Sequence, residues 1–264
     1  MSTETTAEML NSVNRLTETV IHKIAEIDTA VVRATTEVKE TITNQTRVNV
    51  YVDAEHGDDS HDGISAPYKT LKAALTRSMP YGSYLNVRLL SNVEITSQIW
   101  FSGRHIIMDL RGYTLNFPSV NIFDGSGVLV GTGLAPLRGA RDATLVIHNG
   151  AITTGDAISN NLGDQWFFHR NRVMIQMGGI AINPGLYTVT LNRLNITLGQ
   201  RIVGLSGGSD GANLYRGQGM IQSTMFETTI DVTATNASMF GYGVNIRNDT
   251  FIDNAGNTIT GTAA

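Results

Sequence analysis

The sequence predicts a mainly β protein in which a long N-terminal α-helical coiled coil is followed by a solenoid of stacked, parallel β-coils. The first observation is the composition, because 27 glycines and only 16% charged residues favour many short strands and tight turns over packed helices. The second is an uninterrupted helical apolar period in the first 46 residues, and the third is a strand pattern that recurs from residue 108 onward. We divide the chain into residues 1–46, a stalk, residues 47–82, a turn and capping helix, and residues 83–264, the β body.

Length and charge exclude several classes of protein. A chain of 264 residues with 41% hydrophobic residues can bury a substantial core. The net charge of −4 provides no basic surface for nucleic acid, and the absence of cysteine excludes disulfides and thiolate metal sites. No apolar run reaches the roughly 20 residues that span a bilayer, and the first residues lack the pattern of a secretory signal. We therefore expect no membrane insertion, and we expect synthesis in the cytoplasm without an export signal.

The stalk is predicted from apolar residues that follow one another at intervals of three or four, with no proline or glycine between them. Their mean interval of 3.625 residues lies between a heptad and an eleven-residue repeat, which predicts a nearly straight bundle. The large apolar members are the predicted oligomerisation residues. The series comprises Val13, Leu16, Val20, Ile24, Ile27, Val31, Ala34, Val38 and Ile42.

Such a helix exposes a narrow apolar seam that its own segment cannot cover, so identical copies are the simplest cover. β-Branched residues at most core positions are compatible with two or three strands, and the pattern alone does not fix the number. The alternative is a surface helix folded back onto the rest of the chain. A trimer would also protect the edges of a solenoid, so we expect a homotrimer.

A compact acidic turn follows the stalk. Aspartate side chains accept hydrogen bonds from nearby backbone N–H groups and glycine permits positive φ, which predicts a structural turn. A bound Ca²⁺ is the alternative, although the spacing does not match an EF-hand loop. A short helix beginning near Thr70 then places Tyr68, Leu71, Ala74 and Leu75 on one face, which suits the covering of an open stack. The turn is formed by Asp53, Gly57, Asp58, Asp59, Asp62 and Gly63.

The stretch YVDAEHGDDSHDGISAPYKTLKAAL (51–75), with PYGSYLNVRLL (80–90), resembles the opening segment of pectate-lyase-like right-handed parallel β-helices. These occur in bacteriophage tailspikes and tail fibres as well as in polysaccharide lyases. In that family the segment caps the first coil, so the resemblance implies a right-handed parallel β-helix. It covers only about 40 residues and is shared by lyases, hydrolases and inert binding fibres. No catalytic motif of the family is recognisable, and the chain is short for a depolymerising tailspike.

A repeated pattern predicts the β body independently of the resemblance. It is shared by residues 108–117, 145–154, 189–198, 219–228 and 244–253. Mostly apolar residues recur at places one, three and eight, which predicts inward-facing strand residues on either side of a corner. Successive third places are 37, 44, 30 and 25 residues apart, as in solenoid repeats with loops. An antiparallel β-sandwich is the alternative, but regular hairpin signals are weak. The corner at place five holds Gly112, Asn149, Arg193, Ser223 and Asn248.

No catalytic or metal motif stands out. Glycosidases and lyases need two carboxylates, or a carboxylate and a base, across a groove, and no pair here has a recognisable spacing. The histidines lack metal-ligand spacing, so we predict no metal and no cofactor. Without a recognisable catalytic motif, the sequence favours a non-enzymatic protein over an enzyme but does not decide between them. The candidate carboxylates are Asp124, Asp142, Asp156, Asp164, Asp210, Glu227, Asp231 and Asp249. The histidines are His22, His56, His61, His105, His148 and His169.

Two long insertions, residues 155–172 and 199–219, are the predicted glycan contacts. Aromatic faces flanked by hydrogen-bonding groups suit sugar rings, although the same aromatic residues could pack a loop against the stack or lie at a subunit contact. The predicted glycan-binding residues are Trp166, Phe168, His169, Arg170, Tyr215 and Arg216.

Together, the pattern and the resemblance predict a homotrimeric bacteriophage virion fibre, such as a tail fibre or receptor-binding protein. Its coiled coil would attach to another virion protein, and its β-helix would bind a bacterial surface polysaccharide. The alternatives are a tailspike depolymerase and a non-enzymatic capsid or collar decoration fibre.

Overall fold

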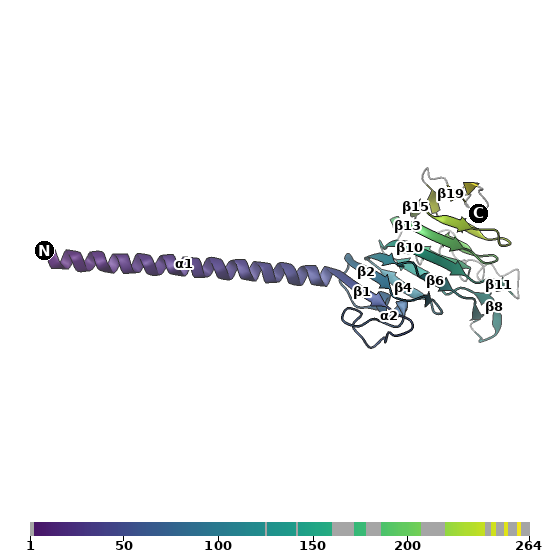
Figure 1. The fold of residues 1–264 in the computed structure, drawn as a ribbon, viewed down its shortest axis with the longest axis horizontal. Helices are drawn as coiled ribbons and strands as arrows, with labels where there is room; N and C mark the ends of the chain where they lie inside the picture. Colours follow the sequence, from purple (N-terminus) through teal and green to yellow (C-terminus); the bar gives the residue numbers. More distant parts are fainter. Residues whose placement is uncertain are drawn as a thin grey trace. The chain divides into compact units, whose positions relative to one another are not determined.

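The structure is a computed structural model that describes residues 3–124, 126–140, 142–159, 172–177, 186–206, 220–240, 244–246, 251–252 and 258–259. It confirms a mainly β protein with one long N-terminal helix (Figure 1). The chain divides into two compact units, residues 1–46 and 47–264.

Helix α1 (Thr3–Thr46) is 44 residues long. Because neither proline nor glycine interrupts it, the backbone ladder is continuous, and threonine hydroxyls such as that of Thr17 donate to the carbonyl oxygen four residues earlier. Exposed ion pairs join Lys23 to Glu26 and Arg33 to Glu37. Within the part of the chain that the structure describes, no helix combines the length and apolar character needed to cross a membrane.

The body contains a main sheet in which neighbouring strands are parallel and follow the chain order. Shorter strands extend this sheet beyond a corner, where β6 pairs with β3 and β10, and β16 pairs with β13. The main strands are β1 (Arg47–Val52), β2 (Ser83–Leu89), β5 (Arg104–Asp109), β10 (Thr144–Thr154), β13 (Leu186–Thr197), β15 (Met220–Phe226) and β18 (Val244–Ile246). The extending strands are β3 (Val93–Glu94), β6 (Thr114–Phe117) and β16 (Thr229–Asp231).

A second parallel sheet is built from the segments between the main strands, in the order β17-β14-β12-β9-β4. The chain thus passes repeatedly from the main sheet to the second and returns to add a strand beside its predecessor. The strands of the second sheet are β4 (Ile99–Ser102), β9 (Leu137–Ala140), β12 (Val173–Met177), β14 (Val203–Ser206) and β17 (Ser238–Phe240). Small antiparallel ladders join β7 (Val120–Phe123), β8 (Leu129–Gly133) and β11 (Ile158–Ser159), and also β19 (Phe251–Ile252) and β20 (Thr258–Ile259).

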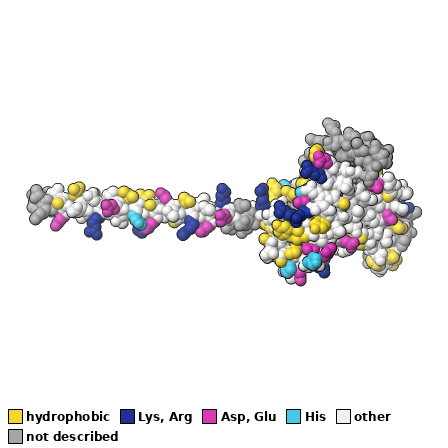
Figure 2. Space-filling model, viewed as in Figure 1, with side chains coloured by type: hydrophobic (Ala, Val, Ile, Leu, Met, Phe, Trp, Pro, Cys, Tyr) yellow, Lys and Arg dark blue, Asp and Glu magenta, His cyan; other side chains and the backbone are white. Residues whose placement is uncertain are grey.

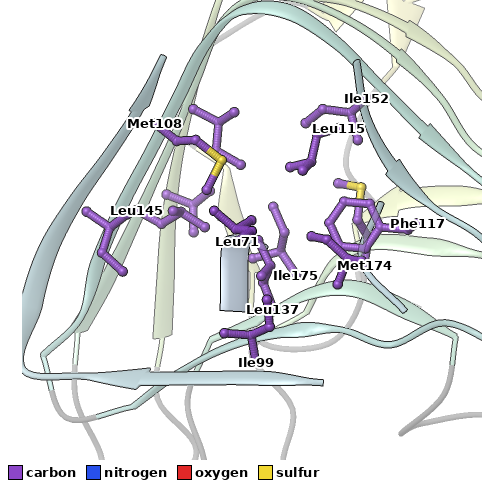
Figure 3. Close-up of a cluster of buried hydrophobic side chains, with 14 of the residues drawn as sticks. Leu71, Ile99, Met108, Leu115, Phe117, Leu137, Leu145, Ile152, Met174 and Ile175 are labelled. Atoms are coloured by element: carbon purple, nitrogen blue, oxygen red, sulfur yellow. The ribbon is translucent and has the colours of Figure 1, made fainter. Parts of the chain in front are cut away.

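The core lies between the two parallel sheets and is closed in part by helix α2 (Leu71–Thr76). Side chains from both sheets and from α2 point into one interior, where Leu115 and Ile152 lie across from Leu137 (Figure 3). The Thr70 hydroxyl caps α2 by accepting the backbone N–H of Ala73. Tyr68, Leu71, Ala74 and Leu75 are all buried, so the expected helix start and its apolar face are confirmed.

The strand register corrects part of the five-segment alignment. The second and third segments pair as aligned, with Leu145 beside Val189. In the first segment, however, Met108 pairs with Ile147 rather than with Leu145, the partner that the alignment predicts. After the corner, Leu115 pairs with Ile152 as the alignment predicts. That corner therefore holds two more residues than the next one.

The fourth segment is displaced by four residues from its aligned position, because Ser223 rather than Gly219 pairs with Val189. The fifth segment is displaced by two residues relative to the fourth, because Val244 pairs with Ile221 rather than with Gly219. The expected inward residue Phe226 is consequently 55% exposed, and Ile230 occupies the buried place. A strand pattern of period two is unchanged by shifts of two or four residues, so alternation identified inward faces without fixing the register.

Corners of successive segments share a left-handed backbone. Gly112, Asn149 and Arg193, all expected at the corner, have φ of 88°, 61° and 53°. Ser223 was placed there wrongly, since it is a buried strand residue, and Glu227 with φ 46° takes the corner instead. Because φ above zero is uncommon for residues other than glycine, this recurrence marks the turn that redirects each of the first four segments. Asn248, the expected corner of the fifth segment, lies outside the described residues.

Candidate functional site

The six predicted glycan contacts lie outside the described residues, as do several of the candidate carboxylates. The glycan contacts are Trp166, Phe168, His169, Arg170, Tyr215 and Arg216, and the carboxylates are Asp164, Asp210 and Asp249. These predictions stay untested, and the candidate surfaces described below come from other parts of the chain.

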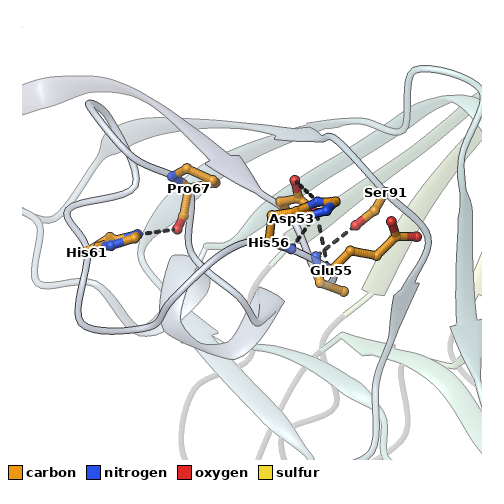
Figure 4. Close-up of polar contacts among 7 residues, drawn as sticks. Asp53, Glu55, His56, His61, Pro67 and Ser91 are labelled. Carbon is orange, nitrogen blue, oxygen red and sulfur yellow. Dashed lines mark hydrogen bonds and ion pairs between the residues drawn. The ribbon is translucent and has the colours of Figure 1, made fainter.

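The acidic turn is held together by its own backbone (Figure 4). Asp53 accepts the N–H groups of Glu55 and His56 at 3.0 and 3.2 Å, and Ser91 Oγ accepts the N–H of Ala54 at 2.7 Å. Burial acts to raise the pKa of Asp53, but hydrogen bonds from the His56 and Glu55 backbone and from Ser91, together with the nearby His56 ring, leave the pKa below its usual value. The carboxylate therefore works as a turn-forming acceptor.

Asp62 and Asp59 serve the same purpose further along the turn. Asp62 Oδ1 accepts the N–H groups of Ile64 and Ser65, each at 2.8 Å, which lowers the pKa of Asp62 to about 2. Asp59 binds both the N–H and the hydroxyl of Thr70, at 2.7 and 2.8 Å, and so ties the turn to the start of α2. Among the described residues, no three His, Asp or Glu side chains are grouped so that they could hold a metal ion.

The described candidate carboxylates are each engaged in a separate local contact. Asp124 and Asp231 accept hydrogen bonds within their own turns, and Asp156 accepts the N–H of Gln200 at 2.6 Å. Asp142 accepts the Tyr81 hydroxyl at 2.9 Å, and Glu227 pairs with Arg193 at 2.7 Å.

One histidine lies close to a carboxylate at a corner of the main sheet. His148 Nδ1 is 3.7 Å from Asp109 Oδ1, and the Asn149 amide reaches both groups, at 2.7 and 3.3 Å. Asp109 lies on β5 and His148 on the neighbouring strand β10, and their contacts with the Asn149 amide stabilise the left-handed corner at Asn149. It forms part of the lateral packing of the strands.

The predicted oligomerisation residues form an exposed apolar seam along α1, and Figure 2 shows hydrophobic side chains recurring along this helix. Leu16 is 64% exposed and Ile24 is 53% exposed; the side chain of Ile42 lies outside the described residues. A second apolar stripe was not expected: Leu10, Ile21 and Val32 are also exposed and are spaced eleven residues apart. Residues eleven apart lie on nearly the same side of a helix, so the sequence spacing could have predicted this stripe. The other exposed seam residues are Val13, Val20, Ile27, Val31 and Val38.

A groove of about 300 Å³ lies between α2 and the second sheet. Trp100 projects from the outer face of β4 and is 41% exposed, while its neighbours Ile99 and Phe101 are buried in the core. Trp100 was not among the residues predicted to bind a ligand. The available signal was a large aromatic residue at an outward place in an alternating strand, QIWFS. The groove is lined by Leu75, Thr76, Trp100, Phe101, Ser102, Arg104 and Ala140.

Two guanidinium groups accompany this aromatic ring. Arg138, on the adjacent strand β9, is only 2% exposed and its guanidinium carbon lies 5.2 Å from the centre of the Trp100 ring. Arg104 donates through Nη1 to the carbonyl oxygen of Leu75 at 3.0 Å, and burial lowers its pKa. An arginine stays protonated even after such a shift, so the groove combines an aromatic face with positive charge.

Comparisons of the chain with protein-family models, with curated proteins and with solved structures found no match.

Proposed function

We propose that this chain is a virion fibre of the bacteriophage tail-fibre type, with an oligomeric coiled-coil stalk and a right-handed parallel β-helix that adheres to a host-surface glycan. The observation that carries the proposal is the pairing of a long helix with an exposed apolar seam and a body of parallel strands added in chain order. Each half matches what a fibre needs: one surface that assembles copies and one rigid surface that is displayed.

The β-helix is supported by the way the chain alternates between two parallel sheets. Parallel neighbours need a crossover, and here every crossover after β2 supplies a strand of the second sheet, such as β9 between β6 and β10. The corners at Asn149, Arg193 and Glu227 recur at equivalent places, as expected for stacked coils. The capping role of α2 and the resemblance of residues 51–90 agree with this arrangement.

The oligomeric stalk is supported by the width of the apolar face on α1. A two-helix coil covers a narrow seam, whereas Leu10, Ile21 and Val32 widen the apolar face to one side. A third helix would cover both the seam and this second stripe. We therefore propose a homotrimer, in which the stalk also provides the attachment to another virion protein.

Adhesion is supported by the groove at Trp100, where a half-exposed aromatic ring lies beside hydroxyl and guanidinium groups. Sugars are recognised by this combination, because their C–H faces stack on aromatic rings while their hydroxyls find hydrogen-bonding partners. The predicted contacts around Trp166 and Tyr215 stay predictions of further adhesive residues.

The intact mass of the assembly tests the stalk, and polysaccharide incubation tests the body. We expect a mass three times the 28.5 kDa of one chain. On incubation with a panel of purified bacterial surface polysaccharides, we expect retention of at least one intact polymer. New reducing ends or unsaturated sugars would instead indicate a depolymerase. A single-chain mass would contradict the fibre proposal. An oligomer that retains no polymer would favour the alternative of a non-enzymatic decoration fibre.

A further inference from the structure

We infer that the groove at Trp100 and Arg104 is a subsite for a sugar residue that carries a carboxylate, such as a uronic acid. This inference rests on the proposed glycan adhesion and adds the chemical class of the ligand. It depends on three features of the groove: a fixed aromatic platform, a guanidinium at its wall, and hydroxyls at its rim.

The platform is the Trp100 ring. Ile99 and Phe101 anchor β4 in the core at 2% and 3% exposure, so the backbone that carries Trp100 is fixed by packing on both sides. The buried Arg138 guanidinium lies against the ring and restricts it further. A rigid aromatic ring loses little conformational entropy when a sugar stacks on it, which favours the ring as a contact.

The guanidinium is that of Arg104, which lies at the start of β5. One of its N–H groups donates to the Leu75 carbonyl oxygen, and this bond holds the side chain in the wall of the groove. Arginine has five N–H donors in a planar fork, so donors remain after this single bond. Within the described residues, no carboxylate forms an ion pair with Arg104, and the nearby Asp142 is engaged by the Tyr81 hydroxyl.

Partial burial strengthens the case for an anionic ligand. Burial lowers the pKa of Arg104, which means that the charged form is incompletely solvated. A carboxylate that binds the fork in a bidentate fashion would compensate that loss with two charge-assisted hydrogen bonds. A neutral hexose could stack on Trp100 but would leave this charge uncompensated, and acetate would pair with Arg104 but lack the stacked ring.

The rim provides hydroxyls from both sides of the groove. Ser102 is exposed at the end of β4, and Thr76 Oγ donates to the Lys72 carbonyl oxygen at 2.8 Å and keeps its acceptor lone pairs. These groups suit the hydroxyls of a pyranose ring. The lining therefore matches a charged sugar better than it matches a free anion or an apolar molecule.

The chain contains only two tryptophans, Trp100 and Trp166, so fluorine NMR of the full chain labelled with 5-fluorotryptophan gives one resonance per candidate site. Trp100→Phe and Trp166→Phe assign the two resonances. We would titrate sodium glucuronate, methyl glucoside and sodium acetate. We expect glucuronate to move the Trp100 resonance, with binding at least about fivefold tighter than that of either other probe.

Arg104→Gln should remove the preference for glucuronate over methyl glucoside and leave the response to methyl glucoside intact. Arg104→Lys keeps the charge and should bind glucuronate with intermediate affinity, and an unchanged circular dichroism spectrum reports that each variant is folded. Arg88→Gln, at an exposed arginine on β2 outside the groove, is the matched control and should change nothing.

Equal responses to glucuronate and methyl glucoside, or a Trp100 resonance that no sugar moves, would overturn the inference. If only the Trp166 resonance moves, this subsite is wrong while glycan adhesion stands. Polymer retention and the mass of the assembly test the fibre function separately, because neither depends on the choice of subsite.

Discussion

The two units of this chain treat their apolar residues in opposite ways. Along α1 the large apolar side chains are about half exposed or more, as with Val20 at 47% and Val32 at 66%. In the body the inward residues of the parallel strands, such as Leu145 and Val189, are completely buried. Burial of apolar surface is the main favourable term in folding, so the body contains its own core while the helix needs another surface. The contrast separates what one chain stabilises alone from what we propose several chains stabilise together.

The largest expected effect is loss of the assembly through the seam of α1. Ile24→Asp combined with Val31→Asp would place two charges where sister helices are proposed to meet, and unpaired charges are costly to bury. We expect the oligomer to dissociate to single chains at micromolar concentration, with a loss of helical circular dichroism, because isolated helices are marginal in water. Light scattering and circular dichroism measure both effects.

Thr29→Asp is the control for this prediction. Thr29 is exposed on α1 and its hydroxyl donates only to the Ala25 carbonyl oxygen. We expect the control to keep the full mass. An unchanged oligomer in the double variant would remove the seam as the interface.

The next effect concerns the core of the body. Phe117 is completely buried, so Phe117→Ala should lower the free energy of unfolding by about 3–5 kcal/mol through lost burial and a cavity. Phe123, only six residues further along, is 54% exposed, and Phe123→Ala should cost less than about 0.5 kcal/mol. Chemical denaturation followed by strand circular dichroism measures both. Similar losses at the two sites would show that the interior is packed differently.

A smaller effect is expected from two glycines with nearly the same backbone conformation. Gly63 and Gly82 have φ of 74° and 75°, but a Cβ at Gly63 would lie 2.2 Å from the Tyr68 ring, whereas one at Gly82 meets nothing within 4 Å. Gly82→Ala should therefore cost only the backbone strain, about 1–2 kcal/mol. Gly63→Ala should cost more, because it also displaces Tyr68 from the turn. Thermal unfolding of both variants separates the steric term from the backbone term, and equal melting temperatures would contradict the packing of Tyr68 against Gly63.

The smallest effect is a pH dependence from Asp62. The pKa of Asp62 is lowered from 3.8 to about 2 by hydrogen bonds from Ile64 and Ser65. Because the folded pKa lies below the unfolded one, the carboxylate contributes stability above pH 3.8, and this contribution is lost as the pH falls through about 2. The difference in stability between the wild type and Asp62→Asn should shrink over that window in denaturation curves. A difference that is constant from pH 7 to pH 2 would exclude this role.

The sequence predicted the turn around Asp53 and the start of α2 because both depend on local chemistry. An aspartate accepts N–H groups two or three residues away, and Thr70 caps the helix that follows it. The alternation of β10 and β13 was equally readable, since inward side chains recur at every second residue. The register of β5 and β15 was wrong in the alignment, because shifts of two or four residues leave that alternation unchanged.

The sequence by itself determined the helical period of the first 46 residues and the inward faces of most strands, since both follow from the spacing of side chains along one element. Only the tertiary structure decided which residues pair across strands and that Leu75, Trp100, Arg104 and Ala140 line one groove. These residues come from helix α2 and three strands, and their proximity depends on how many residues each corner and loop contains. That number sets the register of every later strand, and no local pattern encodes it.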